Sequence, residues 1–359
     1  MMEKIFKPNY AIHPGITLAK VLDTINLSQK DLAARIDVTE KHISEIVQCK
    51  SSITSDMALK FEYATGISAS FWLGLQKNYE EILARNDMDV AVKQETELAK
   101  KYPHKDMVSF GWISKPTSPL DLVDQLLKFF GVDSLLLVPT VYSSAFRKSS
   151  VATAKPESVA VWLRQGWRMS NEQKTDEFSR ERIIAFLPEF KKMTEMKLTD
   201  ALPALTEKCR QCGIALVVMH QPAGAPVNGT TQWLSKEKVL IQLSLRYSYA
   251  DIFWFTFFHE LGHILKHGKK AIYIDFSKGI SNTNIEFEKD ADQFASTNLI
   301  SSVAYQQLCT ETNISAKQIV DLSTKEGVHP GIIVGRLQHD KKILYSHLNQ
   351  LRERYCWKS

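Results

Sequence analysis

The sequence predicts an α+β protein that is mostly α-helical and has three parts. Apolar residues recur at helical spacing through residues 16–66 and again through most of residues 86–205. Period-2 alternation at 239–246 predicts strands, and an almost wholly apolar stretch at 251–265 predicts a buried helix. We therefore expect an all-α domain at 1–86, a helical connector at 87–205, and a domain with a small antiparallel sheet at 206–359.

Two short helices joined by a tight turn are expected in the first part. Residues 27–47, LSQKDLAARIDVTEKHISEIV, carry apolar positions at helical spacing on both sides of a turn. Ser28 and Thr39 stand where helix N-caps belong, and Asp31 follows Ser28 by three, as in a capping box. The pattern predicts a helix-turn-helix whose second helix, Thr39 to Val47, enters a DNA groove. The residues expected to contact DNA are Lys30, Thr39, Glu40, Lys41, His42 and Ser44.

This stretch resembles a known family, together with HPG at 13–15, SSIT at 51–54 and FWLGLQKNYE at 71–80. Nearly all of residues 10–85 resembles the HigA-type antitoxins, a branch of the Cro/CI (XRE) helix-turn-helix fold. The resemblance implies operator DNA as a partner, binding as a homodimer, and a toxin as a further partner. Residues 1–86 carry ten Lys and Arg against ten Asp and Glu, so the basic footprint of DNA binding is weak. A module that docks on another repressor is the alternative.

The connector and the strands are predicted from apolar spacing. LDLVDQLLKFF at 120–130, ESVAVWLRQGW at 157–167 and DEFSRERIIAFLPEF at 176–190 each show a helical apolar face. We expect this part to pack on the C-terminal domain. The apolar run at 214–219 and the alternation at 239–246 predict two strands of the sheet, which would leave one edge for an extended peptide.

The run HELGH at 259–263 contains residues typical of a catalytic metal site. One helical turn separates His259 from His263, so both imidazoles leave one face of the helix, with Glu260 beside them. Buried imidazoles and a buried carboxylate are costly unless something satisfies them, and Zn²⁺ does so directly. The residues predict a zinc site in which Glu260 is the general base for a water molecule. The alternative is a pair of core histidines satisfied by hydrogen bonds.

A carboxylate on a second helix would complete the ligands. In EFEKDADQFASTNLI, residues 286–300, apolar positions mark a buried stripe, and Glu288 lies on that side. Glu286 and Asp290 fall on flanking faces and remain alternatives. Asp292 is placed to accept the second ring N–H of a liganding histidine. Gly268 is expected to end the helix. His267 lies eight residues beyond His259, about 12 Å along a helix, so it is expected to cap the helix end and not to bind the metal.

These motifs resemble the ImmA/IrrE family of metallo-endopeptidases. HELGHILKH is followed about twenty-five residues on by ExxADxFA, and the flanking VNGTTQWLSKEKVLIQLSLRY and HPGIIVGRLQ fit the same family over roughly the last 150 residues. The resemblance implies a zincin-like fold and a gluzincin-like Zn²⁺ site with His259, His263 and Glu288 as ligands and Glu260 as base. It also implies cleavage of a helix-turn-helix repressor that controls stress or mobile-element genes.

Length, charge and hydropathy limit the number of domains, the partners and the cellular location that we expect. The 359 residues exceed one ordinary domain, and a net charge of +5 is too small to dictate a partner. No apolar run reaches about 18 residues without charge, and MMEKIFKPNY lacks a signal-peptide core, so we expect a cytoplasmic protein with no membrane partner. Three hypotheses follow: a zinc endopeptidase guided by its N-terminal domain, a DNA-binding regulator whose zinc domain senses a signal without cleaving, and an antitoxin-like operon member.

Overall fold

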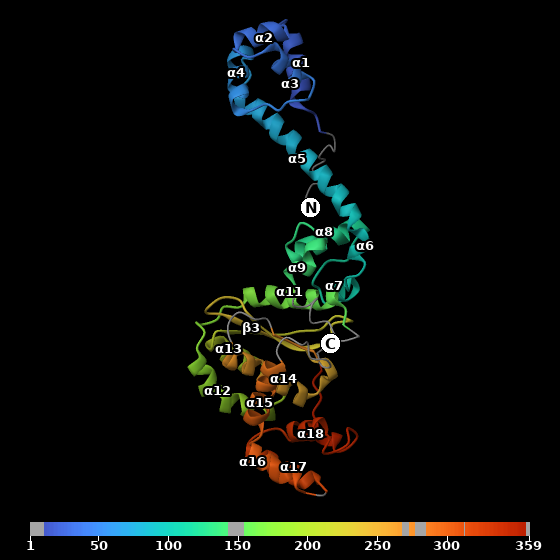
Figure 1. Cartoon of the computed structure of the whole chain (residues 1–359), viewed down its shortest axis with the longest axis vertical. Helices are drawn as coiled ribbons and strands as arrows, with labels where there is room; N and C mark the ends of the chain where they lie inside the picture. Colours follow the sequence, from blue (N-terminus) through green and yellow to red (C-terminus); the bar gives the residue numbers. More distant parts are fainter. Residues whose placement is uncertain (1–10, 143–153, 268–272, 277–284, 312, 357–359) are drawn as a thin grey trace. The chain divides into compact units, whose positions relative to one another are not determined.

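The computed structural model describes residues 11–142, 154–267, 273–276, 285–311 and 313–356. The chain divides into two compact units, Met1–Glu95 and Thr96–Ser359, which are described separately (Figure 1). Helices dominate both units, and a small sheet lies in the second, so the predicted α+β, mostly α class is confirmed. The finer division at 1–86, 87–205 and 206–359 stays a prediction.

The N-terminal unit is a bundle of helices around one apolar core. Its helices are α1 (Pro14–Thr24), α2 (Gln29–Arg35), α3 (Glu40–Val47), α4 (Ser55–Thr65) and α5 (Ala69–Gln94). Leu18, Leu32, Ile43, Phe61 and Trp72 are fully buried and come from all five of these helices. The apolar spacing that predicted the helices therefore also selects the core.

The turn between α2 and α3 has the local structure that its residues favour. Ser28 caps α2 by accepting the N–H of Asp31, and Thr39 caps α3 by accepting the N–H of His42. Asp37 adopts φ 52°, a left-handed conformation that Asp tolerates better than most residues. These features stop α2 and start α3 within four residues, which confirms the predicted pair of helices.

His13 is an unusual N-cap for helix α1. Its Nδ1 accepts the N–H of Gly15 at 3.0 Å, Pro14 follows at the first helical position, and the ring packs edge-on against Tyr79. The second HPG, at 329–331, uses His329 in the same way. Nδ1 can accept a hydrogen bond only while it carries no proton, so the cap needs a neutral imidazole.

Acid is therefore expected to destabilise the N-terminal unit. Burial lowers the pKa of His13, so the unfolded chain takes up a proton more readily than the folded unit does. The contribution is fully present above the ordinary histidine pKa of about 6.5 and is lost as pH falls below it. We expect a loss of about 1 kcal/mol, a typical N-cap contribution, in urea unfolding at pH 5.5 against pH 7.5. A His13→Asn cap does not titrate, so equal pH dependence in that variant would contradict the assignment.

The second unit contains the remaining helices and the sheet. Its described α-helices are α6 (Thr96–Ala99), α7 (His104–Ser109), α8 (Pro119–Phe130), α9 (Val138–Val141), α11 (Pro156–Glu172), α12 (Arg180–Lys192), α13 (Leu198–Gln211), α14 (Ala250–Lys266), α15 (Ile285–Leu299), α16 (Ser302–Cys309), α17 (Ala316–Glu326) and α18 (Pro330–His339). Its strands are β1 (Ile214–Val218), β2 (Val227–Trp233), β3 (Val239–Leu243) and β4 (Tyr273–Phe276). The three connector helices predicted at 120–130, 157–167 and 176–190 correspond to α8, α11 and α12.

The sheet is mixed, which corrects the predicted antiparallel sheet. The strand order is β1-β3-β2-β4, with β1 parallel to β3 and the other two pairs antiparallel. A tight connection joins β2 to β3 as a hairpin, whereas the longer segment 219–226 passes the end of β3 and lets β1 pair with its other edge. Alternation along a strand says which residues share a face and nothing about strand direction, so the sequence could not distinguish the two arrangements.

Helices cover both faces of this sheet (Figure 1). Val159, Trp162 and Leu163 of α11 pack against Val217 and Leu240 on one face. On the other face α13 and α14 contribute to a larger core that includes Ile214, Leu216, Val239, Ile241 and Leu243. As a result even polar Gln242 is buried, and its Nε2 donates to the Trp162 carbonyl at 2.8 Å. Helix α11, which lies within the predicted connector, thus packs on the sheet.

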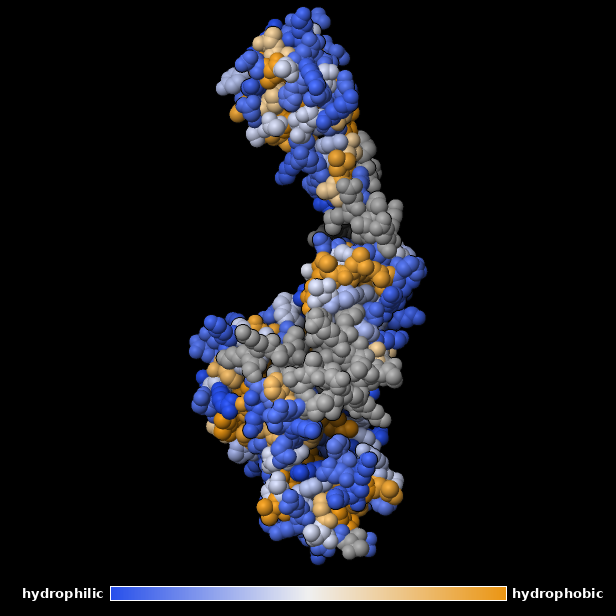
Figure 2. Space-filling model, viewed as in Figure 1, coloured by the Kyte–Doolittle hydropathy of each residue, from blue (hydrophilic) through white to orange (hydrophobic). Residues whose placement is uncertain are grey.

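The surface is mainly hydrophilic where the described residues show it. Figure 2 shows polar residues over most of the visible face of each unit, with apolar side chains between them. Among the described residues, no helix combines the length and the apolar character that a membrane crossing requires.

Candidate metal centre

Helix α14 places the HELGH residues inside the second unit. Apolar residues surround it: Phe253, Trp254, Phe257, Phe258 and Leu261 are all buried in one core. His259, Glu260 and His263 are buried as well, with exposed fractions of 4%, 0% and 1%. A buried helix with three ionisable side chains on one stretch requires partners for them.

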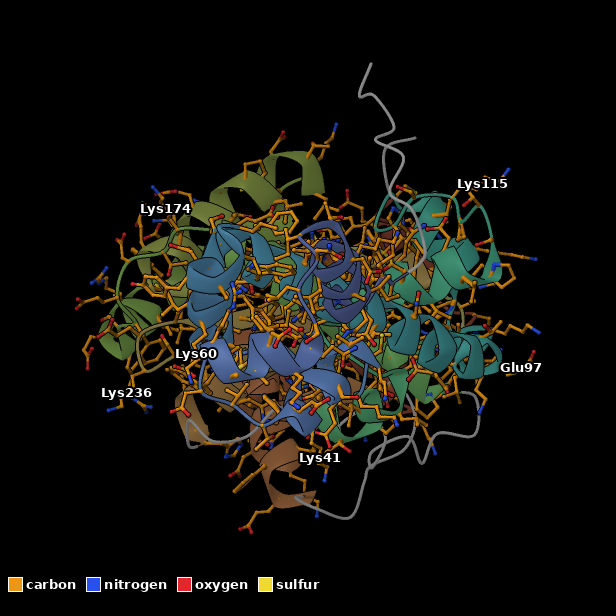
Figure 3. All side chains as sticks on the ribbon, turned by 90° about the horizontal axis from the view of Figure 1, so that it is seen from above. Lys41, Lys60, Glu97, Lys115, Lys174 and Lys236 are labelled. Atoms are coloured by element: carbon orange, nitrogen blue, oxygen red, sulfur yellow. The ribbon has the colours of Figure 1, made fainter. Side chains whose placement is uncertain are left out.

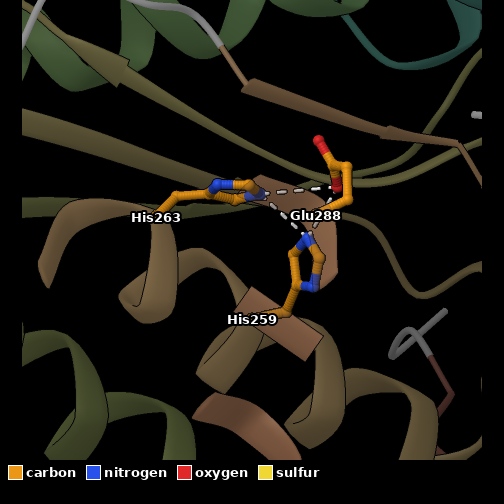
Figure 4. Close-up of side chains that lie close together, drawn as sticks. All are labelled: His259, His263 and Glu288. Atoms are coloured by element: carbon orange, nitrogen blue, oxygen red, sulfur yellow. Dashed lines mark hydrogen bonds and ion pairs between the residues drawn. The ribbon is translucent and has the colours of Figure 1, made fainter. Parts of the chain in front are cut away.

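Helix α15 brings Glu288 to the two histidines (Figure 4). The two imidazole Nε2 atoms lie 2.9 Å apart, and Glu288 Oε2 lies 3.2 Å from Nε2 of His259 and 3.6 Å from Nε2 of His263. Ligands that surround a zinc ion tetrahedrally at 2.0–2.1 Å lie about 3.3 Å from one another. The donor atoms therefore have the type and the separations that fit Zn²⁺. Glu286 and Asp290, the two alternatives, are exposed.

The electrostatics of the cluster suit a cation. Burial alone would raise the pKa of Glu288, but its close interactions with the His259 and His263 rings outweigh burial and hold its pKa below the usual range. Burial lowers the pKa of His263 to about 4, despite an opposing hydrogen bond to Glu288. At neutral pH the cluster thus offers an ionised carboxylate and a neutral imidazole, the forms that bind metals.

Small residues let the two helices approach closely. A Cβ atom on Gly262 would lie 3.0 Å from the Ala291 Cα and 3.2 Å from its carbonyl oxygen, so α14 and α15 touch backbone to backbone there. This contact lies one residue from His263 and three from Glu288. A larger residue at either position would push the helices apart and separate the carboxylate from the imidazoles. Apolar spacing alone did not predict this role for Gly262 or Ala291.

Asp292 lies where the spacing predicted it. His259 Nδ1 is 2.8 Å from Asp292 Oδ1, while His259 Nε2 faces His263 and Glu288. Donation from Nδ1–H to the carboxylate would leave Nε2 unprotonated toward the cluster and fix the ring orientation. Its role as an orienting carboxylate remains a prediction.

His267 is the C-cap residue of α14, as expected, and its backbone N–H donates to the His263 carbonyl oxygen at 3.1 Å. Its backbone is extended, its Nε2 lies 3.0 Å from the Phe287 carbonyl oxygen of α15, and its ring stacks on Phe287. Arg180 of α12 also donates to the Leu265 carbonyl oxygen at this helix end. His267 therefore ties α14 to α15 beside Glu288, and among the described residues it is not part of the cluster of three. Gly268, expected to end the helix, lies outside the described residues.

Strand β2 meets Glu260 from the sheet. Thr231 Oγ1 donates to Glu260 Oε2 at 2.6 Å, and a Cβ on Gly229 would lie 2.7 Å from Glu260 Oε1. Neither contact with Glu260 was predicted from the sequence, because contacts over 29 and 31 positions leave no periodic signal.

The predicted DNA-contacting residues lie together in the N-terminal unit. Glu40 and Lys41 are exposed at the start of α3, where Figure 3 labels Lys41, whose side chain is 84% exposed. His42 and Ser44 are half-buried on the same helix. Lys30 is exposed on α2, and Thr39 caps α3. Their contact with DNA stays a prediction.

Known proteins are similar to this chain in its N-terminal part and in its C-terminal part. Residues 250–334 match the IrrE N-terminal-like domain of the M78 peptidases. Virulence-associated protein I of Dichelobacter nodosus is 37% identical over 78 residues, 21% of this chain and 72% of that protein. The HTH-type transcriptional regulator YddM of Escherichia coli K12 is 28% identical over 78 residues, 22% of this chain and 83% of that protein. The chain combines a HigA-like helix-turn-helix domain with an IrrE N-terminal-like domain.

Similar solved structures match the HigA-like part of the chain. An addiction module antidote protein of the HigA family from Coxiella burnetii is 30% identical, with 24% of this chain and 94% of that chain covered and a TM-score of 0.23. The chain spans between 60% and 83% of the length of the curated relatives. The IrrE N-terminal-like match contains α14, α15 and the whole His259, His263 and Glu288 cluster.

Proposed function

We propose that this chain is a zinc-dependent endopeptidase and transcriptional regulator that hydrolyses a peptide bond in a helix-turn-helix repressor. The observation that carries the proposal is the convergence of His259, His263 and Glu288 in one cluster, with Glu260 on the same helix. A purely structural zinc site has no need of a carboxylate base beside its ligands. The family resemblance of the C-terminal domain supports the substrate class.

The residues of the chain would divide the reaction between them. His259, His263 and Glu288 would hold the Zn²⁺ ion, which supplies Lewis acidity for water and for the scissile carbonyl group. Glu260 would accept a proton as the water oxygen bonds to the carbonyl carbon. As the C–N bond breaks, Glu260 would return that proton to the leaving nitrogen. Asp292 would keep His259 in the tautomer that presents Nε2.

The HigA-like domain would bind operator DNA as a homodimer. The start of α3 would meet base edges through Glu40, Lys41 and His42, and Lys30 would contact the phosphate backbone. The Pseudomonas aeruginosa antitoxin HigA has been solved with a promoter, and PA4674 of the same species in complex with its operator DNA. A toxin would be a further partner if the chain belongs to an antitoxin-like operon.

The complete burial of Glu260 favours a second candidate function, a metal-binding regulator that does not cleave. The exposed fraction of Glu260 is 0%, and Thr231 already donates to its carboxylate. A regulator that binds metal and senses a signal without cleaving would use the same cluster in this way. The two candidates differ in turnover, not in metal binding.

The test is incubation of the zinc-loaded full chain with purified helix-turn-helix repressors from the same genome. We expect cleavage of at least one repressor, and loss of that cleavage when a chelator removes the metal. A zinc-loaded chain that cuts none of these repressors would favour the sensing regulator.

A further inference from the structure

Two residues of strand β2, Gly229 and Thr231, lie beside the Glu260 carboxylate. Thr231 Oγ1 donates to Oε2 at 2.6 Å, and the side chains of Thr231 and Glu260 are fully buried. Gly229, two residues earlier and thus on the same face of the strand, leaves the space beside Oε1, where a Cβ would lie at 2.7 Å. The same Cβ would lie 2.5 Å from Thr256 Cγ2, so no side chain fits there without movement.

The strand itself is fixed on both sides. Thr231 is opposite Ile241 of β3 and Tyr273 of β4, and Gly229 is opposite Leu243 and Asp275. A strand paired on both edges cannot slide without breaking hydrogen bonds of two ladders. The Thr231 hydroxyl is therefore held at a constant place relative to the sheet, and α14 packs directly on that sheet.

A general base needs this kind of support. The Glu side chain has several rotatable bonds, and proton transfer requires its oxygen within about 2.6–3.2 Å of the reacting group. We propose that Thr231 is a positioning residue, which holds the Glu260 carboxylate in one orientation, and that Gly229 provides the room for that orientation. The proposal rests on the peptidase function proposed above.

Two substitutions separate positioning from a general structural role. Thr231→Val keeps the shape and removes the hydroxyl group, whereas Thr231→Ser keeps the hydroxyl group. Thr256→Val is the matched control, because Thr256 is also buried and lies one turn before Glu260 on α14. Metal content and thermal unfolding are measured for each full-length variant.

Activity is measured on the same-genome repressors and on β-casein. We expect Thr231→Val to lower kcat by about 10–100-fold, with KM and metal content nearly unchanged, as for other residues that orient catalytic groups. Thr231→Ser and Thr256→Val should stay near the wild type. The proposal is overturned if Thr231→Val keeps the wild-type kcat. It is also overturned if the kcat of Thr231→Ser, or that of Thr256→Val, falls as far as the kcat of Thr231→Val.

A chain without peptidase activity can be distinguished from a chain in which Thr231 does not position Glu260. If the wild type cuts neither probe, crystal structures of the metal-free wild type and Thr231→Val decide the positioning role alone. A Glu260 carboxylate that leaves its wild-type orientation in the variant supports the role of Thr231. An unchanged carboxylate overturns it.

Discussion

Glu260→Gln is expected to lower kcat for peptide hydrolysis by about 10²–10⁴-fold while the chain keeps its metal. Gln has nearly the same shape as Glu and can still accept the hydrogen bond from Thr231, but its amide cannot take up a proton as a carboxylate does. Since Glu260 is not one of the three clustered ligand groups, metal binding should not depend on its charge.

The measurement is kcat and zinc content side by side for the wild type and two matched variants. Glu286→Gln makes the same chemical change at an exposed position of α15 and should keep both activity and metal. Glu288→Gln should reduce metal content and therefore activity. Cleavage that persists in Glu260→Gln would refute the proposed base.

Arg352→Met is expected to cost about 3–5 kcal/mol of the free energy of unfolding, because it leaves a buried carboxylate without its cation. Arg352 binds Asp251 at the start of α14 through two hydrogen bonds of 2.7 and 3.0 Å, and both side chains are less than a tenth exposed. Arg352 also donates to Gln338. The C-terminal segment thereby anchors the helix that carries both histidines.

Urea unfolding of the full chain checks this expectation. The double variant Asp251→Leu with Arg352→Met should recover most of the loss, since well-packed apolar residues often replace a buried ion pair at little cost. Gly335 packs tightly on Asp251, so the recovery need not be complete. A loss below about 1 kcal/mol in Arg352→Met alone, the range of an exposed ion pair, would contradict the role of the pair.

The sequence was most informative where function depends on local spacing. Two histidines one helical turn apart must share a face of α14, and the apolar stripe of α15 turns Glu288 toward the same side. Likewise Ser28 and Thr39 act within three residues of themselves, so their caps were predictable. Each of these relations is set by helix geometry alone.

Relations between distant segments could not be predicted in the same way. The contact of Thr231 with Glu260 and the close approach of Gly262 to Ala291 depend on how β2, α14 and α15 pack. The parallel pairing of β1 with β3 depends on the path of a connecting loop. His267 ends α14 as its position predicted, but the contact of its side chain with the Phe287 carbonyl of α15 could not be predicted. Apolar periodicity carries no information about such pairings.

The central claim is that His259, His263 and Glu288 bind one divalent cation. Its most direct test is a crystal structure of the zinc-loaded protein with anomalous differences recorded at the zinc absorption edge. We expect one peak within about 2.0–2.2 Å of both Nε2 atoms and a Glu288 oxygen. A peak bound by other residues, or no peak at this cluster in a zinc-saturated crystal, would contradict it.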